Sequence, residues 1–98
     1  MRIKLHPHAH AELRAARKWY YERSPLSAFA FAQTIQNAIS RIKDAPNIFP
    51  VSDHGTRKFL LQRFPFNIFY RTGETEIVIV AVAHQKRRPG YWSSRAMP

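Results

Sequence analysis

The side chains best suited to chemistry follow the last hydrophobic run of this chain. The apolar run at 77–83 leads directly into His84, and from His84 to Arg95 the sequence contains no acidic residue. Residues at the end of a strand are held rigidly yet face solvent, which suits binding or chemistry on an anionic partner. The cations predicted to contact such a target are Lys86, Arg87, Arg88 and Arg95.

Several of these residues also have purely structural explanations. His84, at the end of a buried strand, can hydrogen-bond a backbone carbonyl of a neighbouring loop. Tyr91 and Trp92 can pack a short C-terminal turn onto the sheet. Arg87 and Arg88 are harder to explain in this way, because two adjacent cations repel each other unless something anionic approaches. Both interpretations stay open for His84 and Tyr91.

The composition bounds the class of protein. The chain has 98 residues, about the size of one compact unit, so we expect a single domain over 1–98. Seven Phe, four Tyr and two Trp favour a packed core, and the absence of Cys excludes a disulfide framework and a thiolate nucleophile. No stretch approaches the ~18 apolar residues of a membrane span. No signal peptide is recognisable either, so we expect a cytoplasmic protein with no membrane partner.

Charge is the second bound. Sixteen Lys and Arg against six Asp and Glu leave a net charge of +10. Such an excess favours nucleic acid, a ribosome or an acidic protein as partner, with a merely solubilising surface as the alternative. A non-enzymatic nucleic-acid-binding module that relies on charge is therefore one hypothesis, although no recognition helix or stacking Phe pair supports it.

Two helices are predicted near the N-terminus. Ile3 and Leu5 alternate with polar residues as in a half-buried strand, and Pro7 then permits a helix to begin. The Ser24-Pro25 pair ends the first helix and begins the second, because Ser is a favoured N-cap and Pro fits the first helical position. The apolar stripes of the two helices are Ala9, Leu13, Ala16 and Tyr20, and then Ala28, Phe31, Ile35, Ala38, Ile39 and Ile42.

Three β-prone runs follow, at 57–63, 64–71 and 76–83. Their order predicts an α+β fold with an N-terminal strand, a two-helix antiparallel hairpin and a three-strand antiparallel meander in one small sheet. A short C-terminal turn or helix completes it. Tyr70 and Phe69 alternate, so one of them is expected in the core, and Arg71 is expected to pair with Glu74 or Glu76 across the hairpin.

The C-terminal half carries specific motifs. Phe-Pro-Phe-x-Ile-x-Tyr-Arg stands at 64–71, Ile-x-Ile-x-Ala-Val-x-His at 77–84 and Arg-x-Pro-x-Tyr-Trp at 87–92. With the order of elements, these motifs resemble the RelE/ParE superfamily of bacterial type II toxins over nearly the whole chain. The resemblance implies a toxin neutralised by a co-encoded antitoxin. RelE-like members cut messenger RNA on the ribosome, whereas ParE-like members poison DNA gyrase.

The resemblance also allows the nuclease positions to be compared one by one. Cleavage by the 2′-hydroxyl of RNA needs a base, a cation for the phosphorane and an acid for the leaving oxygen. Of the RelE-like positions, Lys58 and Tyr91 match in type, whereas two expected cations fall on Leu60 and Asn67 and a third falls near Gln85. Gyrase is therefore the favoured target. The alternative is a ribosome-dependent endoribonuclease with catalytic Lys58, His84, Arg87 and Tyr91.

An antitoxin needs a surface to bind. A free sheet edge and the outer side of a helical hairpin invite an added strand or an amphipathic helix from an acidic partner. The apolar residues expected to be exposed, because they do not fall on the predicted stripes, are Trp19, Tyr21, Phe29 and Phe49, and these are the predicted antitoxin contacts. No cofactor is expected. No metal is expected either, because Pro7 breaks the alternation of His6, His8 and His10.

Overall fold

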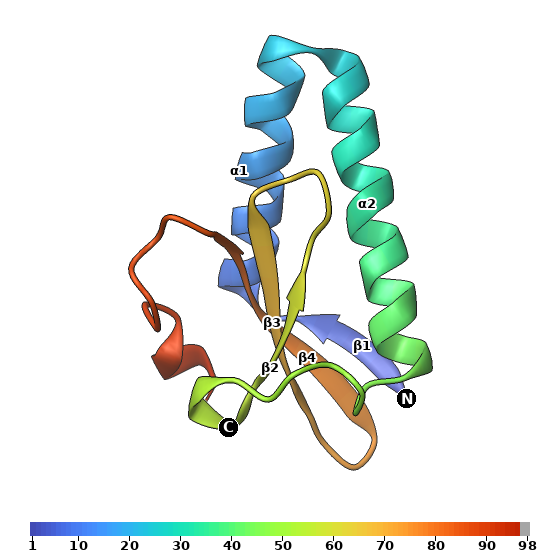
Figure 1. The fold of residues 1–98 in the computed structure, drawn as a ribbon, viewed down its shortest axis with the longest axis vertical. Helices are drawn as coiled ribbons and strands as arrows, with labels where there is room; N and C mark the ends of the chain where they lie inside the picture. Colours follow the sequence, from blue (N-terminus) through green and yellow to red (C-terminus); the bar gives the residue numbers. More distant parts are fainter. Residues whose placement is uncertain (97–98) are drawn as a thin grey trace.

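The computed structural model describes residues 1–96. It has the predicted α+β architecture, with two long helices standing beside a small twisted sheet (Figure 1). The elements in chain order are β1 (Arg2–Leu5), α1 (Pro7–Arg23), α2 (Pro25–Asp44), the short 3₁₀ helix η1 (Asp53–Gly55), β2 (Arg57–Leu60), β3 (Phe66–Thr72), β4 (Glu76–His84) and the 3₁₀ helix η2 (Ser93–Arg95).

The sheet is mixed, with the strand order β1-β4-β3-β2. Strands β2, β3 and β4 form the predicted antiparallel meander. Strand β1 joins the sheet as a parallel neighbour of β4, with Ile3 opposite Ile77. A parallel pair needs a long crossover, and the helical hairpin is part of the connection between these two strands. The longest strand, β4, therefore lies in the interior of the sheet.

A single residue separates the two helices. The Ser24 backbone N–H donates to the Tyr20 carbonyl and closes α1, while the Ser24 hydroxyl accepts from the Ser27 N–H at 3.3 Å and opens α2. Pro25 occupies the first position of α2, where its missing N–H costs no intrahelical bond. The predicted helix boundary is confirmed, and the short connection makes the helices antiparallel neighbours.

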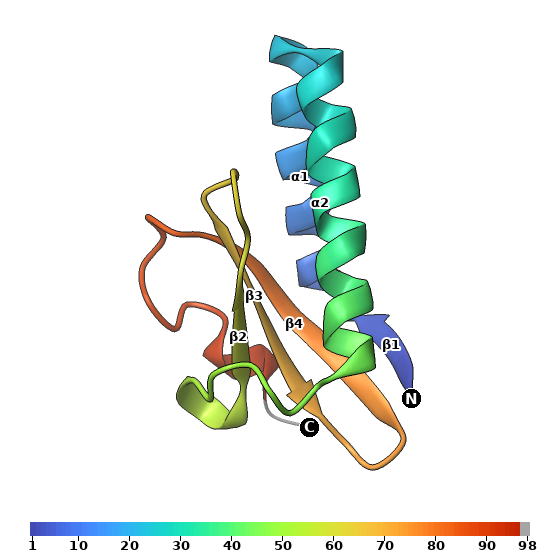
Figure 2. The same ribbon diagram turned by 45° about the vertical axis from the view of Figure 1, so that its right-hand side comes forward.

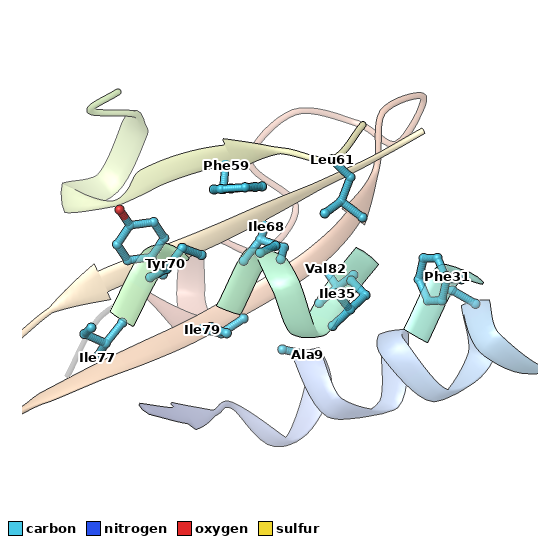
Figure 3. Packing of buried hydrophobic residues seen from close by; sticks show 13 residues of the cluster. Ala9, Phe31, Ile35, Phe59, Leu61, Ile68, Tyr70, Ile77, Ile79 and Val82 are labelled. Atoms are coloured by element: carbon cyan, nitrogen blue, oxygen red, sulfur yellow. The ribbon is translucent and has the colours of Figure 1, made fainter. Parts of the chain in front are cut away.

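The main core lies between the helical hairpin and one face of the sheet (Figure 3). The predicted helix stripes face this core, with Leu13, Tyr20 and Ile39 only partly buried. From the sheet, Ile68 and Tyr70 point into it, and both side chains are fully buried. The Tyr70 hydroxyl donates to the Pro46 carbonyl at 2.7 Å. Tyr70 is therefore the core member of its pair and lies outside any site.

A second, smaller core covers the opposite face of the sheet. Its buried members are Val78, Val80, Ala81, Ala83, Trp92 and Ala96. The register of β3 and β4 shifts between Phe69 and Tyr70, so Val80 and Ala81 both belong to this second core. Figure 2 shows the helices on one face and the C-terminal segment, in red, on the other. Strand β4 is consequently buried along Ile77–Ala83, as its apolar run predicted.

The predicted pairing of Arg71 across the β3–β4 hairpin is wrong. Glu76 instead lies 3.6 Å from Arg2 and 3.9 Å from Lys4, because β1 is the neighbour of β4 on the other side. The Nε of Arg71 is buried and has no hydrogen-bond partner among residues 1–96. Sequence proximity within the hairpin suggested the wrong partner for Glu76, since the adjacent strand β1 supplies Arg2 and Lys4.

Candidate functional site

The segment after β4 forms a series of tight turns. The Gln85 N–H donates to the Pro65 carbonyl at 2.8 Å, and the Arg87 N–H donates to the His84 carbonyl at 2.9 Å. Gly90 has φ +73°, in the left-handed region that glycine adopts without strain. These turns leave Lys86, Arg87 and Arg88 exposed. We call residues 85–90 the cationic loop.

Arg95 does not belong to this exposed set. Its guanidinium Nη1 lies 2.9 Å from Oε1 of Glu12 and donates to the Val80 carbonyl at 3.2 Å. The Arg95 side chain is only 13% exposed. The expectation that Arg95 faces a target as a free cation is therefore wrong. No local pattern predicts this pairing, because Glu12 and Arg95 are 83 positions apart in the chain.

Glu12 is a residue of this region that the sequence patterns did not single out. It projects from α1 and accepts hydrogen bonds from the Arg95 guanidinium, the Tyr91 hydroxyl and, at 3.0 Å, the Val82 backbone N–H. A carboxylate next to an apolar helix stripe, in a chain with only six acidic residues, is the signal that could have drawn attention to it.

His84 and Tyr91 are both engaged in bonds within the chain. The His84 Nδ1 accepts from the Lys86 backbone N–H at 3.1 Å, so the partner is an N–H and not the predicted carbonyl. In the neutral ring the proton then sits on Nε2. Burial and the hydrogen bond to Glu12 raise the pKa of Tyr91 to about 12. A phenol with this pKa is a weak acid for protonating a leaving oxygen.

The face of the sheet where a RelE-like nuclease would place its cations is neutral at its centre. Leu60 of β2 and Asn67 of β3 are register partners across the ladder. Leu60 is exposed, and the Asn67 side-chain oxygen accepts from the Gln85 amide at 3.3 Å. Lys58 lies two residues before Leu60 and is half-buried. A depression of about 150 Å³ beside Asn67 has Arg87 and Arg88 in its lining, whereas Lys58 and Leu60 do not line it.

The predicted antitoxin contacts divide into two groups. Trp19, Tyr21 and Phe29 are exposed, at 51%, 61% and 66%. Phe49 is half-buried, packs on the main core and lies 4.9 Å from the Phe59 ring, so the prediction that it is exposed is wrong. The loop after α2 runs beside β2, where the Lys58 N–H donates to the Pro50 carbonyl at 2.9 Å, and this places the Phe49 ring against Phe59. Further exposed large apolar residues are Leu26, Ile48, Val51 and Leu60.

An open cleft of about 440 Å³ lies between α1 and the end of β4. Aromatic residues of both helix and strand form much of it, with Trp19 and Tyr20 on one side and Phe66 on the other. Its polar residues include Glu12, His84 and Arg87. The cleft therefore joins the exposed Trp19 on the hairpin to the root of the cationic loop.

Among residues 1–96, no three His, Asp or Glu side chains converge in a way that could hold a metal ion. Within the same residues, no helix has the length and apolar character needed to cross a bilayer.

The fold and this surface define a small basic α+β protein that carries a cationic loop beside an open aromatic cleft. A family model described as "ParE toxin of type II toxin-antitoxin system, parDE" matches residues 3–89. A solved structure titled "Chromosomal ParDE TA system from P. aeruginosa" is 26% identical, with a TM-score of 0.75, over 86% of this chain and 95% of that chain. The comparison with curated proteins gives no match.

The chain therefore belongs to the ParE toxin family, as its resemblance to the RelE/ParE superfamily predicted. The family implies a cognate antitoxin as partner.

Proposed function

We propose that this protein is a toxin that inhibits growth by poisoning DNA gyrase and that a cognate antitoxin neutralises it. The observation that carries the choice of target is the neutral pair formed by Leu60 and Asn67. These residues lie opposite each other on two adjacent strands, at positions where the resemblance to nucleases predicts cations.

The chemistry of RNA cleavage explains why this pair matters. Charge develops on the phosphorane, and preorganised cations aimed at it supply much of the rate enhancement. Losing one such group typically costs about 10²–10³ in rate. Here an isobutyl group and an amide stand in their place, while the nearby Lys58 and cationic loop can dock a phosphate without surrounding it.

The remaining catalytic candidates support the same conclusion. With Nδ1 accepting from Lys86, the neutral His84 ring presents a donor, so it cannot take the proton of a 2′-hydroxyl without first losing that bond. The Tyr91 hydroxyl already donates to Glu12. The loop cations Lys86, Arg87 and Arg88 are exposed and can bind a macromolecular target, which is a role in recognition and not in bond cleavage.

The antitoxin is proposed to bind the hairpin and the aromatic cleft. Trp19 lies on α1 and also lines the cleft, so one partner segment can contact both. Tyr21 and Phe29 are further exposed aromatic residues of the same helical hairpin. A net charge of +10 favours an acidic segment, because opposite charges speed the encounter and exclude basic competitors.

The test adds purified protein to a gyrase supercoiling reaction and, separately, to a translating extract whose message is mapped by primer extension. Inhibited supercoiling or accumulated cleaved DNA complex is expected, with no codon-linked cuts. His84→Ala should retain inhibition. Arg87→Glu/Arg88→Glu should lose about tenfold or more, because reversed charges oppose docking.

The matched control is Arg14→Glu/Arg17→Glu, which makes the same charge change on the exposed outer side of α1. It is expected to inhibit like the wild type. Charge reversal is preferable to removing residues 84–98, because such a truncation also removes the buried Trp92. Position-specific message cleavage that disappears in His84→Ala would refute the proposal and establish the nuclease alternative.

A further inference from the structure

The carboxylate of Glu12 connects three parts of the chain that are far apart in sequence. Its Oε1 accepts from the Val82 N–H at 3.0 Å and from the Arg95 guanidinium at 2.9 Å. Its Oε2 accepts from the Tyr91 hydroxyl. Glu12 is 16% exposed as a side chain, so these bonds form largely out of water. Hydrogen bonds to an ionised group are stronger than neutral ones, and more so in a partly buried site.

The carboxylate bonds to β4 beyond the point at which β1 stops pairing with it. Just after β1, the His6 N–H donates to the Ile79 carbonyl of β4 at 2.8 Å. Further along β4, side chains take over. Glu12 accepts from the Val82 N–H, and Arg95 donates to the Val80 carbonyl. The ion pair thus satisfies two backbone groups of β4 that lie beyond its pairing with β1.

The same ion pair fastens the C-terminal segment. The cationic loop begins after His84, where the Gln85 N–H donates to the Pro65 carbonyl. It is followed directly by Tyr91, whose hydroxyl donates to Glu12. Within the loop, the Arg87 guanidinium lies 3.8 Å from the centre of the Tyr91 ring. Glu12 therefore holds Tyr91, and the Tyr91 ring in turn supports Arg87.

We propose that Glu12 is a positioning residue, whose carboxylate holds the cationic loop in the one arrangement that engages the target. Target engagement rests on the function proposed above, whereas the fastening of the loop does not. The covalent attachment of the loop to β4 fixes only its first end. The second end is held by the packing of Trp92 in the second core and by the bonds that converge on Glu12, and of these it is the Glu12 bonds that reach Tyr91, on which Arg87 lies.

The first measurement is amide hydrogen exchange of a peptide covering 85–96 in Glu12→Gln. The change keeps the size of the side chain but removes the charge, and it leaves Arg95 without its anionic partner. We expect exchange in this segment to accelerate about tenfold, as typical of losing charged hydrogen bonds. Amides of α2 and of β3 should exchange as in the wild type.

Two controls separate this effect from general destabilisation. Glu22→Gln makes the same chemical change at an exposed position of the same helix and should alter nothing. Ile42→Val removes a methylene from the fully buried main core, on the other face of the sheet. It should lower global stability while leaving local exchange of 85–96 unchanged. If Glu12→Gln does not fold, Tyr91→Phe tests the same fastening and should give a smaller acceleration.

The second measurement is inhibition of gyrase by the same variants. Glu12→Gln is expected to lose about tenfold in inhibition, in proportion to its faster exchange. Unchanged exchange of 85–96, or faster exchange with full inhibition, would overturn the positioning role. If the wild type itself leaves gyrase unaffected, the proposed target fails. The exchange data and growth inhibition in cells then still decide the role of Glu12.

Discussion

Replacing Trp92 by alanine should test whether the C-terminal segment is part of the folded structure. Trp92 is 2% exposed, and its ring centroid lies 4.4 Å from that of Phe69 on the second face of the sheet. Removing a buried Trp costs about 3–5 kcal/mol, because apolar contacts are lost and a cavity remains. The expected loss in the free energy of unfolding therefore lies in that range.

The size of this effect makes it easy to measure. A domain of this length is typically stable by about 5–15 kcal/mol, so the variant should still fold, with a reduced margin. With a urea m-value of about 1–3 kcal/mol/M, the midpoint of unfolding should fall by roughly 2 M. Unfolding in urea followed by circular dichroism at equilibrium gives both the midpoint and the slope.

The chain contains a matched control, since it has two tryptophans. Trp19 is 51% exposed, and the Arg23 guanidinium carbon lies 3.6 Å from the centroid of the Trp19 ring. Trp19→Ala should cost no more than about 1 kcal/mol, the usual strength of an exposed cation–π contact. Each variant leaves one tryptophan, so its fluorescence should report a buried Trp92 or a solvated Trp19. A loss below about 1 kcal/mol for Trp92→Ala would contradict the packing described here.

Two further predictions concern the hydrogen bond between Tyr91 and Glu12 and the surface proposed to bind the antitoxin. Absorbance at 295 nm, wild type minus Tyr91→Phe, should show the Tyr91 hydroxyl titrating near 12, raised from 10.0 by burial and by Glu12. Because the pKa of Tyr91 is raised in the folded state, the contribution of its neutral hydroxyl to stability should be complete below pH 10 and lost as the pH rises through about 12. A titration midpoint near 10 would contradict the buried hydrogen bond to Glu12. Phe29→Asp should weaken binding of the cognate antitoxin about tenfold or more in calorimetric titration, because a charge enters an apolar contact. Val51→Asp, also exposed, should bind as the wild type does, and equal affinities for the two variants would place the antitoxin elsewhere.

Much of the fold was predictable because local rules fix it. The Ser24-Pro25 pair ends one helix and begins the next through a cap and a missing N–H, both of which act within four residues. The helix stripes and the apolar run of β4 are likewise patterns of short period, and the structure buries them as predicted. The exposure of Lys86, Arg87 and Arg88 followed from their being three consecutive charged residues after a strand.

The sequence by itself therefore determined the elements, their order, the excess of positive charge and the family. The tertiary structure alone decided what each element meets. It placed β1 beside β4, gave Glu76 two cations from that strand, and joined Glu12 to Arg95. The physical reason is the separation along the sequence between the residues that interact. Helix caps and stripes depend on neighbours within one or two turns. The hydrogen bonds of Glu12 instead join it to partners that are separated from it by 70 to 83 positions in the sequence, and only the folded chain brings these partners into contact.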